Sequence, residues 1–239
     1  MRRQPRAQVQ VLGQKGVRLA RPGPGLDDAI AAQQEALAHG CQSGVGDAAL
    51  AGGRAVVVLL GAAPGSRVLD ACAAPGGKTA HLLERAELDL LALDLKPSRC
   101  RRIADNLSRL GLQASIATAD CARLDTWWDG RPFDAVLADV PCTASGVVRR
   151  NPDAKWLRRE ADIASFAATQ ARILDALWRV VRPGGKLLYV TCSVFPEENG
   201  GQIAAFLVAH PEARRDHEEQ ILPSADHDGF YYCRLEKHA

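Results

Sequence analysis

The chain has 239 residues, a formal net charge of +2, and a composition that is 47% hydrophobic but only 5% aromatic. This length suits one large α/β domain, or one domain with a small appendage, around a core of Leu, Val, Ile and Ala. A net charge so near zero does not indicate nucleic acid by itself. The longest apolar run, residues 55–63, is far shorter than the roughly 18 residues that a membrane helix needs.

Neither a signal peptide nor a zinc-binding pattern is recognisable in the sequence. The basic start Met1-Arg2-Arg3 is not followed by an apolar segment, so we expect a cytoplasmic protein with no membrane partner. The seven cysteines are an odd number, and no pair has the C-x2-C spacing of a zinc site. We therefore expect free thiols in a reducing compartment, no metal, and a monomer.

From about residue 66 onward, predicted strands and helices alternate. The predicted strands are residues 67–72, 88–94, 114–118, 133–139, 186–192 and 230–235. The predicted helices are residues 78–85, 97–110, 160–181 and 197–209, and Pro183-Gly184-Gly185 is expected to end the longest of them. Such alternation is typical of βαβ units. The predicted fold class is therefore α/β, with a mainly parallel sheet and helices on both faces.

Residues 1–65 do not follow this alternation. Residues 21–25 read as a Pro/Gly loop, residues 29–38 as a short helix, and residues 44–53 are rich in Gly and Ala. We predict that residues 1–65 form an N-terminal extension that packs on the main domain, residues 66–239.

A small-residue loop follows the first predicted strand and favours a cofactor site. The loop, residues 70–79 (DACAAPGGKT), contains glycines that let backbone approach a ligand closely. It matches neither G-x-G-x-x-G nor the P-loop, whose first glycine would fall at Ala73. Asp94 ends the second strand about 20 residues later, where doubly wound folds place a carboxylate for ribose hydroxyls. Asp120 follows the third strand, where a carboxylate can meet an adenine amino group, so the pattern favours a nucleoside cofactor without phosphates.

Two cysteines follow the ends of two predicted buried strands. Cys142 comes after the strand 133–139, and Cys192 ends the strand 186–192. Ligands of open α/β sheets bind outside the carboxyl ends of the strands. A free cysteine is often only a small buried hydrophobe, but two thiols at one sheet edge favour cysteine chemistry.

Five further motifs occur in chain order, namely residues 73–79 (AAPGGKT), 139–146 (DVPCTASG), 149–153 (RRNPD), 191–199 (TCSVFPEEN) and 228–232 (DGFYY). Together they closely resemble the RNA cytosine-C5 methyltransferase family, nearest to its bacterial Sun/Fmu-type members that act on small-subunit ribosomal RNA. The resemblance covers the chain from about residue 66 to its end. The resemblance implies a Rossmann-like class I methyltransferase fold, with S-adenosylmethionine as the methyl donor.

The resemblance also implies residue roles. Cys192 is the nucleophile, Cys142 helps to release the product, and Asp139 holds the target base. The residues placed around the cofactor are Cys72, Ala73, Ala74, Pro75, Gly76, Gly77, Lys78, Asp94, Asp120 and Asp139. A thiolate that adds to C6 of cytosine makes C5 nucleophilic, which splits one hard step into easier ones. The opposite assignment is open, because Pro-Cys carries the nucleophile in DNA cytosine methyltransferases.

A basic and aromatic stretch just past Cys142 is the predicted RNA contact. A base inside a helix cannot be reached, so the target cytosine must be single-stranded or flipped out. The predicted RNA-binding residues are Arg149, Arg150, Lys155 and Trp156, and Arg158 and Arg159 continue the stretch. A solvated helix face is the alternative interpretation. Because the stretch lies beside the expected active-site loop, phosphate contact is favoured. The expected substrate is 16S ribosomal RNA.

The N-terminal part resembles the family least. Relatives often carry an N-terminal helical RNA-binding domain, which we do not recognise here, and of a Gln-Asp segment before the cofactor loop only Asp47 matches. Two other functions stay open at this point. One is a non-catalytic RNA-binding remnant, which the presence of both cysteines disfavours. The other is an NAD-dependent oxidoreductase, which the missing G-x-G-x-x-G motif disfavours.

Overall fold

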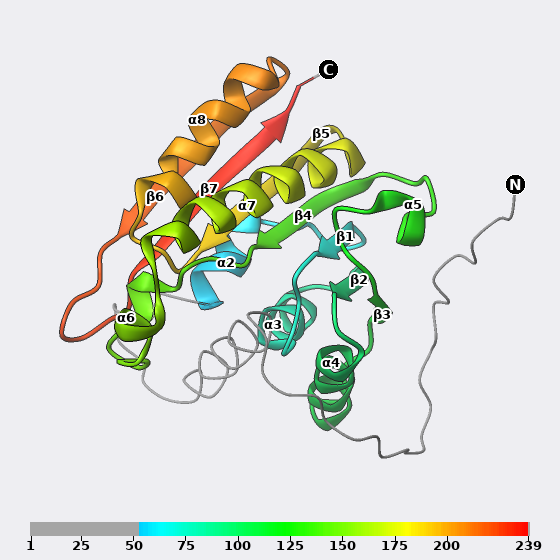
Figure 1. The fold of residues 1–239 in the computed structure, drawn as a ribbon. Helices are drawn as coiled ribbons and strands as arrows, with labels where there is room; N and C mark the ends of the chain where they lie inside the picture. The colour runs from blue at the N-terminus through cyan, green and yellow to red at the C-terminus, as the bar shows by residue number, and fades with distance from the viewer. Residues whose placement is uncertain (1–52, 239) are drawn as a thin grey trace, which may run out of the picture.

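Three layers make up the molecule, with one seven-stranded sheet between two layers of helices (Figure 1). The structure, a computed structural model, describes residues 53–238. The strands are β1 (Arg67–Asp70), β2 (Asp89–Asp94), β3 (Ser115–Thr118), β4 (Phe133–Asp139), β5 (Val181–Thr191), β6 (Ala213–Ile221) and β7 (Phe230–Lys237). The helices are α2 (Gly53–Leu60), α3 (Gly77–Arg85), α4 (Pro97–Arg109), α5 (Leu124–Trp127), α6 (Ala154–Leu157), α7 (Glu160–Val180) and α8 (Gly200–Ala209), with 3-10 turns η2 (Ser145–Val147) and η3 (Pro196–Glu198).

The strand order in the sheet is β3-β2-β1-β4-β5-β7-β6. The five strands from β3 to β5 are parallel, and β7 and β6 pair antiparallel at one side. The predicted mainly parallel α/β sheet is therefore confirmed. The order reverses beside β1, which is the kind of switch point where ligands bind in such folds.

Each face of the sheet is covered by helices through its own apolar cluster. On one face α7 and α8 contribute Leu177 and Phe206 to a buried cluster with sheet residues such as Leu69. On the other face α2, α3 and α4 pack against strand residues such as Val68. Most residues of the two clusters are aliphatic, as the composition predicts. The prediction of helices on both faces of the sheet is confirmed.

Three details differ from the predicted elements. Strand β6 was not predicted, because its residues are largely charged and exposed, as edge strands often are. The predicted helix 197–209 is interrupted at Asn199, between η3 and α8. Helix α7 ends at Val180, before residues 183–185, which instead lie within β5 where its register with β4 shifts between Phe133 and Ala135.

The carboxyl ends of the parallel strands meet at one edge. Asp70 of β1 pairs in register with Ala92 and Leu137, and Asp139 of β4 pairs with Val190. This edge receives the loops after β1, β2, β3, β4 and β5, so every residue predicted for the cofactor and for catalysis lies there or just beyond it.

The predicted division at residue 65 falls between α2 and β1. Residues 1–52 lie outside the described residues, and so do the predicted loop 21–25, the predicted helix 29–38 and Asp47. Val56 and Leu60 of α2 are fully buried against the sheet. No helix among residues 53–238 is long and apolar enough to cross a membrane.

Candidate active site

The two predicted cysteines lie against each other. The loop after β4 carries Cys142 and the loop after β5 carries Cys192, and their Sγ atoms are 3.3 Å apart. Both residues are buried, with 7% and 9% of their surface exposed. The loops are also joined by a backbone hydrogen bond of 2.8 Å from the Gly146 N–H to the Cys192 carbonyl. A Cβ at Gly146 would lie 2.9 Å from that same carbonyl oxygen, so only glycine allows this approach.

The surroundings of Cys192 favour the neutral thiol over the thiolate. Its hydrogen bond with Cys142, together with burial, raises the pKa of the Cys192 thiol well above its ordinary value, against which the positive charge of Lys78 acts. A buried thiol must lose its proton before it can act as a nucleophile.

An ion pair between Lys78 and Asp139 lies beside the cysteines. Lys78 Nζ, from the first turn of α3, is 2.6 Å from Asp139 Oδ2 at the end of β4. Burial alone would lower the pKa of Lys78, but the attraction of the Asp139 carboxylate outweighs it and raises that pKa above its ordinary value. Lys78 thereby keeps its charge and fixes the direction of the Asp139 side chain.

The predicted cofactor loop is held by contacts with α4 and the end of β2. Gly76 has φ +100°, and a Cβ there would lie 3.2 Å from Ile103 of α4. Asp94 accepts hydrogen bonds of 3.3 Å from the backbone N–H groups of Ala74 and Lys96. Arg99 lies 3.3 Å from the same carboxylate. Burial raises the pKa of Asp94 above its ordinary value, although Arg99 and the backbone N–H groups act in the opposite direction.

Other predicted cofactor residues are partly engaged with protein partners. Asp120 accepts a hydrogen bond of 3.0 Å from the Ala122 N–H, and its other oxygen lies 3.0 Å from Arg172. A hydrogen bond with Cys121, with burial, raises the pKa of the Cys72 thiol well above its ordinary value. The sequence analysis did not single out Cys121.

The edge fits a nucleoside cofactor with positive charge. Carboxylates stand at the ends of β1, β2 and β4 and two residues past β3, and they can accept from hydroxyl and amino groups. A Cβ at Gly77 would meet no protein atom within 4 Å, so the loop faces open space there. S-adenosylmethionine has ribose hydroxyls, amino groups and a cationic sulfur, and it has no phosphate. A set of carboxylate acceptors therefore suits it.

Asp70 is a buried acid that the sequence analysis did not single out as a site residue. It ends β1 directly before the loop and is fully buried. Its Oδ2 accepts a hydrogen bond of 2.7 Å from Thr79, while its Oδ1 is buried without a hydrogen-bond partner. Burial raises the pKa of Asp70 to about 7, only partly offset by the Thr79 hydroxyl and Lys78. A strand-end Asp followed by Thr nine residues later was the available signal.

The predicted RNA-binding arginines pair with a buried acid. Arg150 Nε lies 2.7 Å from Asp228 Oδ2, and an Arg149 nitrogen lies 3.5 Å from Oδ1. The arginine side chains are 43% and 35% exposed, whereas the Asp228 side chain is fully buried. Trp156 on α6 is 82% exposed. Lys155 lies in the same helix, and its side chain is outside the described part of the chain.

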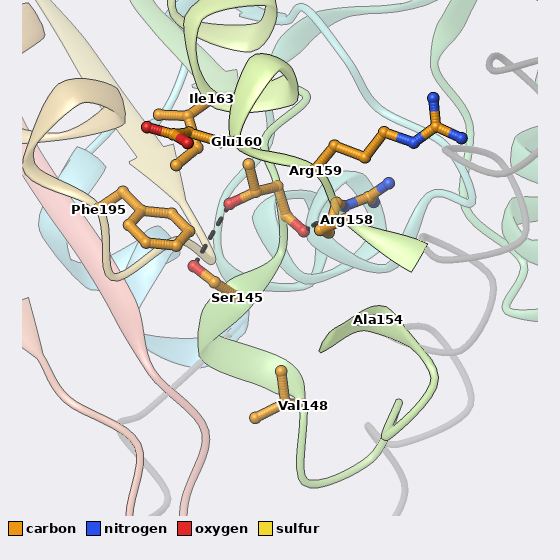
Figure 2. A pocket seen from close by; sticks show the side chains of 9 residues that line it. Ser145, Val148, Ala154, Arg158, Arg159, Glu160, Ile163 and Phe195 are labelled. Atoms are coloured by element: carbon orange, nitrogen blue, oxygen red, sulfur yellow. Dashed lines mark hydrogen bonds between the residues drawn. The ribbon is translucent and has the colours of Figure 1, made fainter. Parts of the chain in front are cut away.

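A pocket adjoins both cysteine loops (Figure 2). Its volume is about 300 Å³, and it is lined by Thr143, Ser145, Val148, Ala154, Arg158, Arg159, Glu160, Ile163 and Phe195. Arg158 Nε donates to the Thr143 carbonyl at 2.8 Å. Thr143 follows Cys142, and Phe195 lies three residues past Cys192, so the pocket is lined by the two loops that carry the cysteines.

Comparison with known proteins gives consistent matches. The sequence model described as 16S rRNA methyltransferase RsmB/F matches residues 57–236. "Ribosomal RNA small subunit methyltransferase B" of Vibrio vulnificus is 49% identical over 183 residues, which cover 73% of this chain and 43% of that protein. The protein of the same name from Salmonella arizonae is 45% identical, over 90% of this chain and 53% of its own length. The chain thus spans about half the length of these curated relatives.

Two solved structures show the same fold. The crystal structure of PH0851 is 34% identical with a TM-score of 0.74, and the match covers 77% of this chain and 45% of that one. The crystal structure of NSun6 from Pyrococcus horikoshii with SFG is 26% identical with a TM-score of 0.70, over 77% of this chain and 51% of that one.

Proposed function

Because the chain belongs to the RsmB/F family of 16S rRNA methyltransferases, we propose that it methylates C5 of a cytosine in 16S ribosomal RNA. Its fold is that of class I S-adenosylmethionine-dependent methyltransferases. The observation that carries the proposal is the pair of thiols 3.3 Å apart at the carboxyl edge of the sheet. Attack at C6 and removal of the proton from C5 take place on adjacent atoms of the base, so two adjacent thiols can serve both steps.

The cofactor is bound by the residues after β1, β2 and β3. In this proposal the loop from Cys72 to Lys78 encloses it, Asp94 accepts from the ribose hydroxyls, and Asp120 accepts from the adenine amino group. When bound, S-adenosylmethionine supplies an electrophilic methyl group on a cationic sulfur. The Asp120–Arg172 pair is partly exposed, so this carboxylate can exchange its partner at little cost.

Cys192 and Cys142 divide the covalent steps between them. The Cys192 thiol loses its proton to solvent and its sulfur forms a bond to C6, which moves electron density to C5. C5 takes the methyl group, and the bond between that methyl group and the cationic sulfur breaks. Cys142 helps to pass the C5 proton to solvent, the electron pair of the C5–H bond restores the C5–C6 double bond, and the bond between Cys192 and C6 breaks. Asp139 hydrogen-bonds the base at N3, and Lys78 holds the Asp139 carboxylate in place.

The RNA lies over the loops after β4 and β5. Trp156 offers an exposed ring for base stacking. The side chains of Arg149 and Arg150 stay partly exposed and so available to phosphates while they pair with Asp228.

A methylation assay tests the proposal. The protein is incubated with methyl-labelled S-adenosylmethionine and with 16S ribosomal RNA from cells that lack this protein. The positions of 5-methylcytosine in the RNA are then mapped. We expect label in 5-methylcytosine with the wild type and none with Cys192→Ala. Label in any other methylated nucleoside, or equal labelling by Cys192→Ala, would refute the proposed chemistry.

A further inference from the structure

Glu198 is a fully buried carboxylate that contacts the residue after each cysteine. It ends η3, and none of its surface is exposed. Its Oε1 accepts hydrogen bonds of 2.8 Å from the Thr143 N–H and 3.1 Å from Gln170 Nε2. Its Oε2 accepts hydrogen bonds of 2.5 Å from the hydroxyls of Thr143 and Ser193. Thr143 follows Cys142 and Ser193 follows Cys192, so one side chain joins both cysteine loops.

The backbone around Glu198 is fixed from two further sides. Its carbonyl accepts a hydrogen bond of 2.7 Å from the Tyr189 hydroxyl of β5. The neighbouring Asn199 donates to the Ser193 carbonyl at 2.8 Å and accepts from the Thr191 hydroxyl at 2.5 Å. The carboxylate therefore cannot shift without moving the loop that carries Cys192.

Ordinary stability does not explain this arrangement. The four donors that the described residues supply to Glu198 are all neutral, and desolvating a carboxylate among neutral donors is expensive. Apolar residues of similar volume often stabilise a fold as well as a buried charge does. What the carboxylate adds is geometry, because its two oxygens fix two loops that are 50 residues apart in sequence at the cysteines.

We propose that Glu198 is a positioning residue that sets the separation of Cys142 and Cys192. The inference rests on the proposed function, and it adds a residue that acts on both cysteines at once through Thr143 and Ser193. Each hydroxyl then controls one chemical step. Ser193 holds the cysteine that adds to the base, and Thr143 holds the cysteine that helps to release it. Misplacing a reacting group by about 1 Å can cost on the order of 100-fold in rate.

The test is a single-turnover reaction with the 16S ribosomal RNA that the wild type methylates. Two products are measured, namely methylated RNA and the protein–RNA adduct that survives denaturing electrophoresis. Ser193→Ala should form adduct at least 10-fold more slowly than the wild type. Thr143→Val should instead accumulate adduct, because it loses the hydroxyl but keeps the backbone N–H bond to Glu198.

Glu198→Gln should lower kcat at least 10-fold, while KM for S-adenosylmethionine stays within twofold of the wild type. Its amide keeps one acceptor oxygen but replaces the other with a donating NH2 group, so the hydrogen bonds to Thr143 and Ser193 must rearrange and the cysteine loops shift. The side-chain volume is unchanged, and a thermal melt checks that the fold is retained. The matched control is Glu197→Gln, which removes the same charge from the exposed neighbouring residue of η3 and should leave kcat unchanged.

The inference and the proposed function fail differently. If Glu198→Gln, Thr143→Val and Ser193→Ala keep the wild-type kcat and the wild-type ratio of adduct to product, Glu198 has only a structural role. If Cys142→Ala forms no adduct in the same assay, the assigned cysteine roles are wrong. In that case a kcat of Glu198→Gln that is still lowered supports the positioning role, because it does not depend on which cysteine attacks.

Discussion

Replacing both Arg149 and Arg150 with alanine should destabilise the fold, because the change removes both positive partners of Asp228. The Asp228 side chain is fully buried, and the arginine nitrogens lie 3.5 and 2.7 Å from its two oxygens. Neither oxygen has a hydrogen-bond partner of good geometry among the described residues. The two guanidinium groups are therefore what compensates this buried charge.

The size of the effect follows from the burial of the acid and the exposure of the arginines. An unpaired buried charge costs about 3–5 kcal/mol. The arginine side chains are 43% and 35% exposed, and solvent screening favours the lower end of that range. We therefore expect a loss of about 3 kcal/mol in the free energy of unfolding at pH 7.

Urea unfolding at pH 7 measures this loss. The wild type is compared with the Arg149→Ala/Arg150→Ala variant, and with the same variant that also carries Asp228→Asn. The asparagine removes the charge, so the triple variant should regain most of the lost free energy of unfolding. An unchanged stability of the double variant, or no recovery in the triple variant, would refute the argument.

This coupling also determines how RNA binding by the arginines can be measured. In the Asp228→Asn background, changing Arg149 and Arg150 to alanine should weaken RNA binding and flatten its salt dependence, because fewer counterions are released. Filter binding over a salt series measures the slope, and affinity for S-adenosylmethionine should not change. An unchanged slope would mean that these arginines only compensate Asp228.

Three further predictions concern the carboxylates and the cysteines. Asp94→Ala should weaken S-adenosylmethionine binding by about 1.5–3 kcal/mol, the range for a hydrogen bond to a charged group, and calorimetric titration with unchanged affinity would remove Asp94 from the site. The pKa of Asp70 is about 7 in the folded chain and about 3.9 in the unfolded one, so the folded state binds the extra proton and its stability should fall as pH rises from 4 to 7. Asp70→Asn should remove this slope of up to about 1.4 kcal/mol per pH unit. Urea unfolding at several pH values from 4 to 7 measures it, and the same pH dependence of the free energy of unfolding in the wild type and in Asp70→Asn would contradict the prediction. Cys192→Ala should form no RNA adduct and Cys142→Ala should trap one, whereas the reverse pattern on a denaturing gel would exchange their roles and keep the reaction class.

The sequence was sufficient for the parts of the fold that follow local patterns. The strand 133–139 and the start of the helix at Glu160 were predicted at the residues where the structure has them, because an apolar run or a periodic face marks each. Strand β6 has no such mark, since its charged residues are set by its place at the sheet edge. Its pairing with β7 is visible only in three dimensions.

The same distinction holds for the site. That Cys142 and Cys192 lie together could be predicted, because both follow strands that end at one edge. Their hydrogen bond, and its effect on the pKa of Cys192, depends on the loop conformation. Asp228 could not be predicted as the partner of Arg150, since 78 residues separate them in sequence. For a basic stretch, sequence reasoning finds the charges but not their counter-charges.

Buried carboxylates connect these findings. The buried acidic residues within residues 53–238 are Asp70, Asp94, Glu198 and Asp228. All of them lie at the edge of the sheet that holds the cysteines, where β1, β2 and β5 end and β7 begins. Each is accommodated differently, Asp70 by a raised pKa, Asp94 by Arg99 and backbone N–H groups, Glu198 by neutral donors and Asp228 by two arginines.

Such a concentration of buried acids is costly for stability, because each must be desolvated on folding. An apolar core elsewhere in the same sheet shows that the fold does not need them for packing. The acids lie instead beside the loops whose geometry the proposed chemistry requires. The free energy lost by burying them is therefore spent where loops must be held in fixed positions. Substitutions that neutralise these acids can therefore raise the free energy of unfolding and still lower activity, which is the usual relation between stability and function at an active site.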